Sequence, residues 1–162
     1  MEVKRNQQRK GNGRMADTKT RGSEKVAVER DLWPDADLYK QNEMPAPRSV
    51  LKQQASFFAR HMKNVLTADV ESSLPEDGSF RTYHNFWIVA PFLGERRYKL
   101  FYARHESQLY PVVLVWAQDD TEFRKCETPD EMRDALTELF RDPRTVEAIR
   151  GMLVDSAAAS SD

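Results

Sequence analysis

Three side chains that could share a chemical site lie near the ends of two neighbouring predicted strands: His84, His105 and Tyr110. Two imidazoles on adjacent strands can chelate a metal ion, but a zinc site needs at least three protein ligands. The only other imidazole, His61, lies on a separate predicted helix. We therefore favour two partly exposed histidines near a strand end, and keep a small enzyme or metal site at His84, His105 and Tyr110 as an alternative.

The single cysteine, Cys126, follows two basic residues, Arg124 and Lys125. Positive charges nearby lower the pKa of a thiol and make it a better nucleophile. No catalytic motif surrounds Cys126, however, and a small residue packed at a strand end is the simpler interpretation. A lone cysteine also excludes an internal disulfide bond.

The dipeptide Asp119-Asp120 could act as a pair of carboxylates in acid–base or metal chemistry. It lies between two predicted strands, and aspartate is a preferred residue of tight turns. A structural role in the turn is therefore the simpler explanation. We predict no catalytic residue, no metal and no cofactor, and a non-enzymatic protein is the favoured interpretation.

The N-terminal segment has the most direct implication for a partner. Residues 1–25 contain eight Lys or Arg and three acidic residues, whereas the rest of the chain is acidic. Such a segment can contact phosphates in a salt-dependent way. Arg96, Arg97 and Lys99, which flank Tyr98 near a predicted hairpin tip, could extend this basic surface. No nucleic-acid-binding motif accompanies them, so nucleic-acid binding is an alternative and a solvated tail is preferred.

The length of 162 residues fits one domain with additional polar sequence. We expect residues 1–30 to form a disordered basic tail and residues 31–46 an extended strap whose large side chains lie on the domain. Residues 47–156 should form the domain, and residues 157–162 a frayed terminus. No apolar run is long enough to cross a bilayer and none follows the N-terminal charges, so we expect a cytoplasmic protein without a membrane partner.

The domain is predicted to be α+β. Apolar residues at three- and four-residue steps favour one long helix over Pro47–Ser72. Four short runs rich in Val, Tyr, Phe and Trp follow, and their short connectors permit only antiparallel neighbours, which gives a four-stranded meander. Two C-terminal helices follow, the first of them opened by a capping box. The four predicted strands are Phe80–Ala90, Arg97–His105, Tyr110–Gln118 and Glu122–Glu127.

Both faces of the predicted sheet are apolar in its middle. Symmetric turns place His84 opposite His105 and Phe101 opposite Leu114. A sheet with one face in water should alternate apolar and polar residues, so we expect the helices, the strap or a partner to cover both faces. The edge of the first strand carries the run Phe86–Ala90, without protecting charges. We expect the strap to shield this edge, with pairing to another chain as the alternative.

These patterns favour a non-catalytic protein-binding module, such as an adaptor, a regulator or an inhibitor-type factor. It would use an apolar or aromatic sheet face or the first-strand edge, and self-association is one form of that binding. The candidate contact residues are aromatic: Tyr83, Trp87, Tyr98 and Tyr102.

Overall fold

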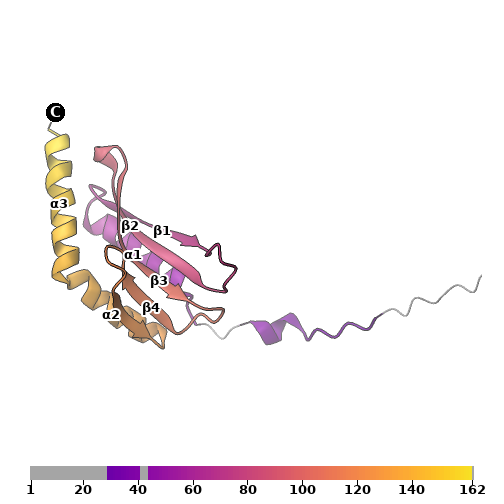
Figure 1. The fold of residues 1–162 in the computed structure, drawn as a ribbon. Coiled ribbons are helices and arrows are strands. Elements are labelled where there is room, and N and C mark those ends of the chain that lie inside the picture. The colour runs from indigo at the N-terminus through magenta and orange to yellow at the C-terminus, as the bar shows by residue number, and fades with distance from the viewer. Residues whose placement is uncertain (1–28, 41–43, 162) are drawn as a thin grey trace, which may run out of the picture. The chain divides into compact units, whose positions relative to one another are not determined.

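The computed structural model describes residues 29–40 and 44–161, which belong to two separate compact units divided after Lys40 (Figure 1). Of the first unit the structure describes residues 29–40, which contain one short 3-10 helix, Ala36–Tyr39. Its first turn is closed by a hydrogen bond from the Leu38 amide to the Asp35 carbonyl oxygen. The predicted docking of the strap on the domain stays a prediction. Residues 1–28 of the predicted basic tail lie outside the described residues.

The second unit is an α+β domain built on one antiparallel sheet, as the sequence predicts, but the sheet has five strands and not four. The strands pair in the order in which they occur along the chain, β1-β2-β3-β4-β5. The elements are α1 (Pro47–His61), β1 (Thr67–Ser73), β2 (Thr82–Ala90), the 3-10 helix η2 (Pro91–Leu93), β3 (Arg96–His105), β4 (Val112–Trp116), β5 (Glu122–Cys126), α2 (Pro129–Arg141) and α3 (Pro143–Ala159).

The additional strand, β1, occupies the second half of the predicted long helix. Helix α1 ends at His61, and Lys63 and Asn64 then adopt positive φ angles of 49° and 61°, which a continuing helix excludes. The sequence-based prediction was wrong because Leu66 and Val70 are four residues apart. Residues four apart share a face in a strand as well as in a helix, so this spacing fits both.

Strand β1 also changes the sheet edge. It pairs with β2 along its whole length, from Thr67 opposite Val89 to Ser73 opposite Tyr83. The expectation that the strap or another chain shields the edge of β2 is therefore wrong, because the chain supplies its own strand there. The outer strands of this sheet are β1 and β5.

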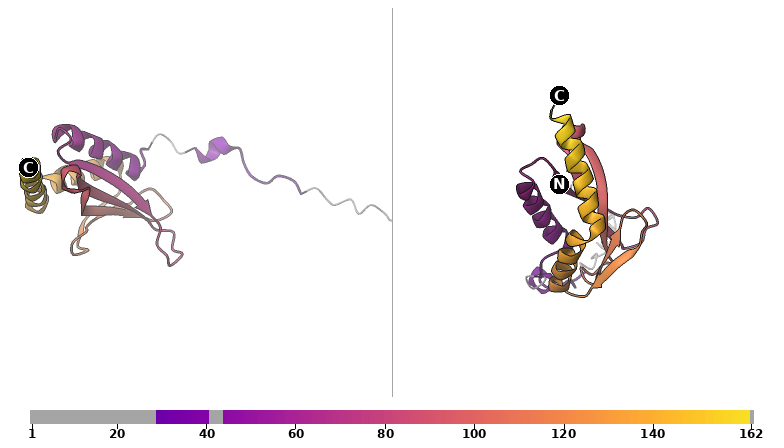
Figure 2. Two further views of the ribbon diagram at one scale, coloured as in Figure 1. Left: turned by 90° about the horizontal axis from the view of Figure 1, so that it is seen from above. Right: turned by 90° about the vertical axis from the view of Figure 1, so that its left-hand side faces the viewer.

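All three helices pack on the same face of the sheet (Figure 2). Their buried residues and the inward side chains of the strands form one core, which includes Leu51, Phe86, Phe101, Leu114 and Leu136. Within residues 44–161 no helix covers the opposite face, so the helices of this unit cover one face only, and cover of the other face by the strap or a partner stays a prediction. None of the helices in the described residues is both long enough and apolar enough to cross a membrane.

The register of the β3–β4 hairpin differs from the predicted one by two residues, and that of the β2–β3 hairpin by two residues up to Phe86 and by three from Trp87 onward. Phe86 lies opposite Phe101, and Phe101 lies opposite Trp116. A slip of two residues leaves side chains on their predicted faces, whereas the slip of three moves Tyr98 to the face of Ile88 and Lys99 to the face of Trp87. A β-bulge on β3, opposite the step from Phe86 to Trp87, leaves Leu100 without a partner on β2, so that Leu100 and Phe101 are both buried.

The C-terminal helices begin where the sequence predicts. The Thr128 hydroxyl accepts a 3.1 Å hydrogen bond from the Glu131 amide, and the Glu131 carboxylate accepts one of 2.7 Å from the Glu127 amide. Asp142 caps α3 by accepting from the Arg144 amide at 2.9 Å. These caps satisfy amides that have no partner within a helix.

Candidate functional site

The uncovered face of the sheet carries a cluster of three aromatic residues, Tyr83 and Trp87 from β2 and Tyr102 from β3. Each is half-buried. The rings of Tyr83 and Tyr102 are 5.7 Å apart between centroids and tilted by 57°. Because residues two apart on a strand share a face, Tyr83 and Trp87 lie on the same side of β2, opposite the helix core. We call these three residues the aromatic face.

Two cations from β3 lie over the aromatic face. The Arg97 guanidinium is 4.7 Å from the centroid of the Trp87 ring. The Lys99 ammonium lies between two rings, 5.8 Å from Trp87 and 5.3 Å from Tyr102. These distances fall within the range of cation–π attraction. The aromatic rings therefore present positive charge beside apolar surface.

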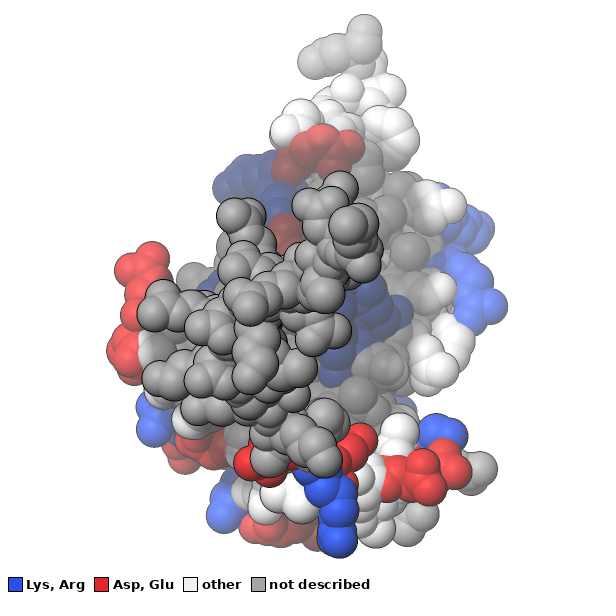
Figure 3. All heavy atoms as spheres, turned by 90° about the vertical axis from the view of Figure 1, so that its right-hand side faces the viewer, with Lys and Arg blue, Asp and Glu red and all other residues white. Residues whose placement is uncertain are grey.

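Carboxylates from the neighbouring strands pair with two arginines of β3, Arg97 and Arg104. Arg97 forms ion pairs with Asp69 at 3.0 Å and with Glu71 at 2.7 Å, both on β1. Arg104 pairs with Glu122 on β5. Charges of both signs also lie side by side over the visible part of the side of the molecule shown in Figure 3. The uncovered face is therefore not a continuous basic surface.

Tyr102 is tied to the turn between β4 and β5. Its hydroxyl donates a 3.0 Å hydrogen bond to the Asp120 carboxylate. Burial, and then this hydrogen bond to an acid, raise the pKa of Tyr102 to about 12. Asp120 has a positive φ of 54°, and the Asp119 carboxylate accepts a 3.1 Å hydrogen bond from the Thr121 amide. Asp119 thus binds a backbone amide of the turn and Asp120 binds Tyr102 of β3, which agrees with the structural role suggested by the sequence.

The indole nitrogen of Trp87 has an unusual environment. Its N–H group is shielded from solvent and has no hydrogen-bond acceptor among the described residues. A buried donor without an acceptor costs about 1–3 kcal/mol of desolvation free energy. Trp87 therefore carries an unused donor at the edge of the ring whose face lies under the Arg97 guanidinium.

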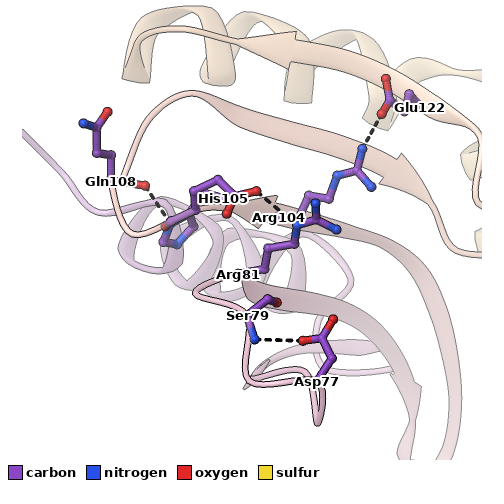
Figure 4. Close-up of polar contacts among 8 residues, drawn as sticks. Asp77, Ser79, Arg81, Arg104, His105, Gln108 and Glu122 are labelled. Atoms are coloured by element: carbon purple, nitrogen blue, oxygen red, sulfur yellow. Dashed lines mark hydrogen bonds and ion pairs between the residues drawn. The ribbon is translucent and has the colours of Figure 1, made fainter.

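A small hollow of about 190 Å³ lies at the end of the sheet where β3 meets β4. Its lining includes Arg81, Arg104 and His105. Figure 4 shows Arg104 directed toward Glu122 and His105 directed toward the backbone of Gln108. This volume is below the roughly 300 Å³ at which ligand pockets usually begin. The hollow therefore offers little room for a substrate.

The structure does bring His84 and His105 together, as the sequence suggested, but as a buried pair in contact. Their Nε2 atoms are 3.0 Å apart. His105 Nδ1 lies 2.7 Å from the carbonyl oxygen of Glu106, which can only accept, so this nitrogen carries the hydrogen. His105 Nε2 then accepts from His84 Nε2–H, and His84 Nδ1 accepts from the Ser72 hydroxyl at 2.7 Å. The result is one directed chain of hydrogen bonds.

This chain of hydrogen bonds is poorly suited to catalysis. Burial, and then the neighbouring His105 and Arg48, lower the pKa of His84 to about 4. A base with such a low pKa attracts the Ser72 proton only weakly, because general bases work best with a pKa near the operating pH. The geometry is better explained as a way to satisfy two buried imidazoles.

The other candidate ligands lie elsewhere. The Tyr110 hydroxyl donates to the carbonyl oxygen of Pro45 at 3.1 Å, and His61 lies on α1 beside an apolar cavity on the helix-covered side of the sheet. Among the described residues no three His, Cys, Asp or Glu side chains are grouped to hold a metal ion. Of the three residues predicted to form one site, His84 and His105 are in contact, whereas the Tyr110 hydroxyl points to Pro45.

Cys126 is buried at the end of β5. Burial, and then the nearby Glu131, raise the pKa of its thiol to about 11 despite the opposing effect of Arg124. A thiol with a raised pKa is a poor nucleophile at neutral pH. This environment agrees with the packing role that we preferred from the sequence.

Two further residues that the sequence suggested for binding, Tyr98 and Arg96, lie away from the aromatic face. Tyr98 lies on the helix-covered side, opposite Ile88, and packs against the core. Arg96 forms a 3.5 Å ion pair with Asp155 of α3. Sequence reasoning missed Ser72, Asp69 and Glu71 because it assigned them to a helix. The alternation of apolar Ala68 and Val70 with these polar residues was the signal that could have revealed a strand.

Comparison with known proteins gives no further guide. No protein-family model matches the chain, and no match was found among curated proteins or solved structures. The function is therefore argued from the residues themselves.

Proposed function

We propose that this chain is a non-catalytic protein-binding module whose contact surface is the aromatic face. One observation carries the proposal: Tyr83, Trp87 and Tyr102 lie together on a sheet face that no helix of residues 44–161 covers. A large apolar surface left in water usually marks a site of interaction.

The composition of this surface is typical of protein interfaces. Tyrosine, tryptophan and arginine contribute most of the binding free energy at such interfaces, where they lie centrally within a rim of polar residues. Here Trp87 and Tyr102 are central, and Arg97, Lys99 and Arg104 surround them. The strands beneath hold the rings on a rigid backbone, which limits the entropy lost on binding.

Charge favours a protein partner over a nucleic acid. Two of the three cations that the sequence assigned to phosphate contact are already paired, Arg96 with Asp155 and Arg97 with Asp69 and Glu71. Carboxylates beside the rings would repel a phosphate backbone. A protein partner can instead match positive and negative groups one by one.

The free donor of Trp87 indicates which group a partner would supply. A carbonyl or carboxylate oxygen that reached the edge of the indole would accept from Trp87 Nε1–H. Such a contact would recover the free energy now lost at this donor. We therefore expect a hydrogen-bond acceptor at the centre of the partner's contact surface.

The test compares the wild type with the double variant Trp87→Ala/Tyr102→Ala in two assays on the purified full-length chain. Sedimentation equilibrium measures self-association, and affinity capture followed by mass spectrometry measures stoichiometric binding of another protein. Phe92→Ala, which removes a 58% exposed side chain in η2, is the matched control. Loss of one association in the double variant alone supports the proposal. An association unchanged by the double variant, or no association in either assay, rejects it.

A further inference from the structure

The helix-covered side of the sheet is not completely filled. A cavity of about 450 Å³ opens between α1 and the C-terminal helices. Phe58 of α1 and Met62, which follows α1, form one wall, Phe140 and Ile149 form the wall on α2 and α3, and Phe86 and Ile88 form its floor on β2. This volume lies within the range of small-molecule sites, roughly 300–1,000 Å³, which are also lined mainly by apolar and aromatic side chains.

The cavity has an apolar floor and a basic mouth. Its floor residues Phe86 and Ile88 are each only 1% exposed. At the mouth, His61 and the exposed ring of Phe57 also line an adjoining hollow of about 360 Å³, and Arg60 is its third lining residue. The cavity therefore has a positive charge at its mouth and apolar side chains at its floor.

Arg60 is well placed to bind an anion. Its guanidinium stacks on the Phe57 ring at 4.9 Å from the centroid, which holds its fork of N–H groups at the cavity mouth. Among the described residues Arg60 has no carboxylate within the 4.0 Å of an ion pair, in contrast to Arg96, Arg97, Arg104 and Arg124. Within residues 29–40 and 44–161, no acidic side chain lines either hollow.

We propose that this cavity binds a free anionic amphiphile, with its hydrocarbon chain over Phe86 and Ile88 and its carboxylate on Arg60. The chain would replace water on apolar side chains, at about 0.8 kcal/mol for each buried CH₂ group. The carboxylate would form charge-assisted hydrogen bonds with the guanidinium. The floor of the cavity thus favours a hydrocarbon chain, and its mouth favours an anionic group. This proposal does not depend on a partner at the aromatic face.

Isothermal titration calorimetry of the full-length chain with three probes of equal chain length tests this assignment. We expect decanoate, below its micelle concentration, to bind saturably, and decanol and decyltrimethylammonium to bind at least tenfold more weakly. Arg60→Ala should weaken decanoate binding about tenfold and leave decanol binding unchanged. Lys52→Ala, an exposed cation on the same helix that lines neither hollow, should change nothing.

A second variant locates the site independently of charge. Gln54 is half-buried on the cavity wall, and Gln54→Trp should fill the space and abolish decanoate binding while circular dichroism shows a folded chain. Persistence of decanoate binding in this variant, or equal binding of the cationic probe, overturns the proposal. Arg60-dependent sedimentation with phosphatidylglycerol vesicles, in a protein that does not bind decanoate, overturns it in favour of a membrane surface.

Discussion

Acidification should destabilise the domain through His84. This imidazole is buried against His105, and its pKa in the folded chain is about 4 compared with 6.5 for an unperturbed histidine. Folding therefore favours the neutral ring. The stabilisation is fully present above pH 6.5, and it is lost as the pH falls from 6.5 to 4, because only the unfolded chain binds the proton in that range.

The magnitude follows from the pKa difference. Each pH unit of difference corresponds to 1.36 kcal/mol, so a difference of about 2.5 units gives an upper bound of about 3 kcal/mol. His84 lies near the exposed Ser72 at the end of the sheet, where solvent screens part of the interaction. We therefore expect a loss of about 2 kcal/mol in the free energy of unfolding between pH 7 and pH 4.5.

Urea unfolding monitored by circular dichroism at several pH values between 4.5 and 7.5 measures this loss. His84→Gln keeps groups that can accept from Ser72 and donate to His105, but it cannot bind the proton. Its free energy of unfolding should therefore fall by about 2 kcal/mol less than that of the wild type over the same range. His61→Gln, at an exposed position, is the control and should behave like the wild type. Equal pH dependence in the wild type and His84→Gln would refute the reasoning.

Three further results are expected. Thr128→Ala removes the acceptor for the Glu131 amide and should lower the free energy of unfolding by about 1 kcal/mol in urea titrations. The control Thr137→Ala, at an exposed position in the same helix, should change it by no more than a few tenths of a kcal/mol. Phe101→Ala removes a fully buried ring stacked on Phe86 at 5.0 Å and should cost about 3–5 kcal/mol, measured in the same way. Cys126 should react with a thiol reagent at neutral pH only as fast as the domain unfolds, so labelling of the native protein at the rate of a free thiol would contradict its burial.

Much of the fold could be predicted because the local signals were unambiguous. The strands around Phe101 and Leu114 are rich in β-branched and aromatic residues, and their short connectors allow only antiparallel pairing. The α2 cap could be predicted from a Thr and a Glu three residues apart. The pairing direction of these strands follows from the length of their connectors, and the start of α2 follows from its capping residues. Neither depends on distant parts of the chain.

Strand β1 could not be predicted for the opposite reason. Its sequence Thr-Ala-Asp-Val-Glu-Ser-Ser has few β-branched residues and contains a four-residue apolar step that suits a helix as well. Only pairing with β2 makes this segment a strand. Tertiary context of this kind overrides local propensity, which is also why the contacts of Ser72 and Arg97 with neighbouring strands were missed.

The candidate site could be predicted in part. The alternation along β2 placed Tyr83 and Trp87 on one face, and the register errors did not change that, because the face of each depends on its position along β2 itself. The pattern could not indicate that all three helices pack on the other face, because an apolar face is compatible with a helix, a strap or a partner. It also could not reveal the cavity beside α1, which depends on how far the helices lie apart.

The central claim is that the aromatic face is where this chain meets its partner. Site-specific photo-crosslinking in cells tests it most directly, with p-benzoylphenylalanine replacing Tyr83 on the uncovered face or Glu147 on the exposed side of α3. We predict a discrete covalent adduct with one protein, or with a second copy of the chain, from position 83 alone. The absence of any adduct at position 83, or the same adduct from both positions, would contradict the claim.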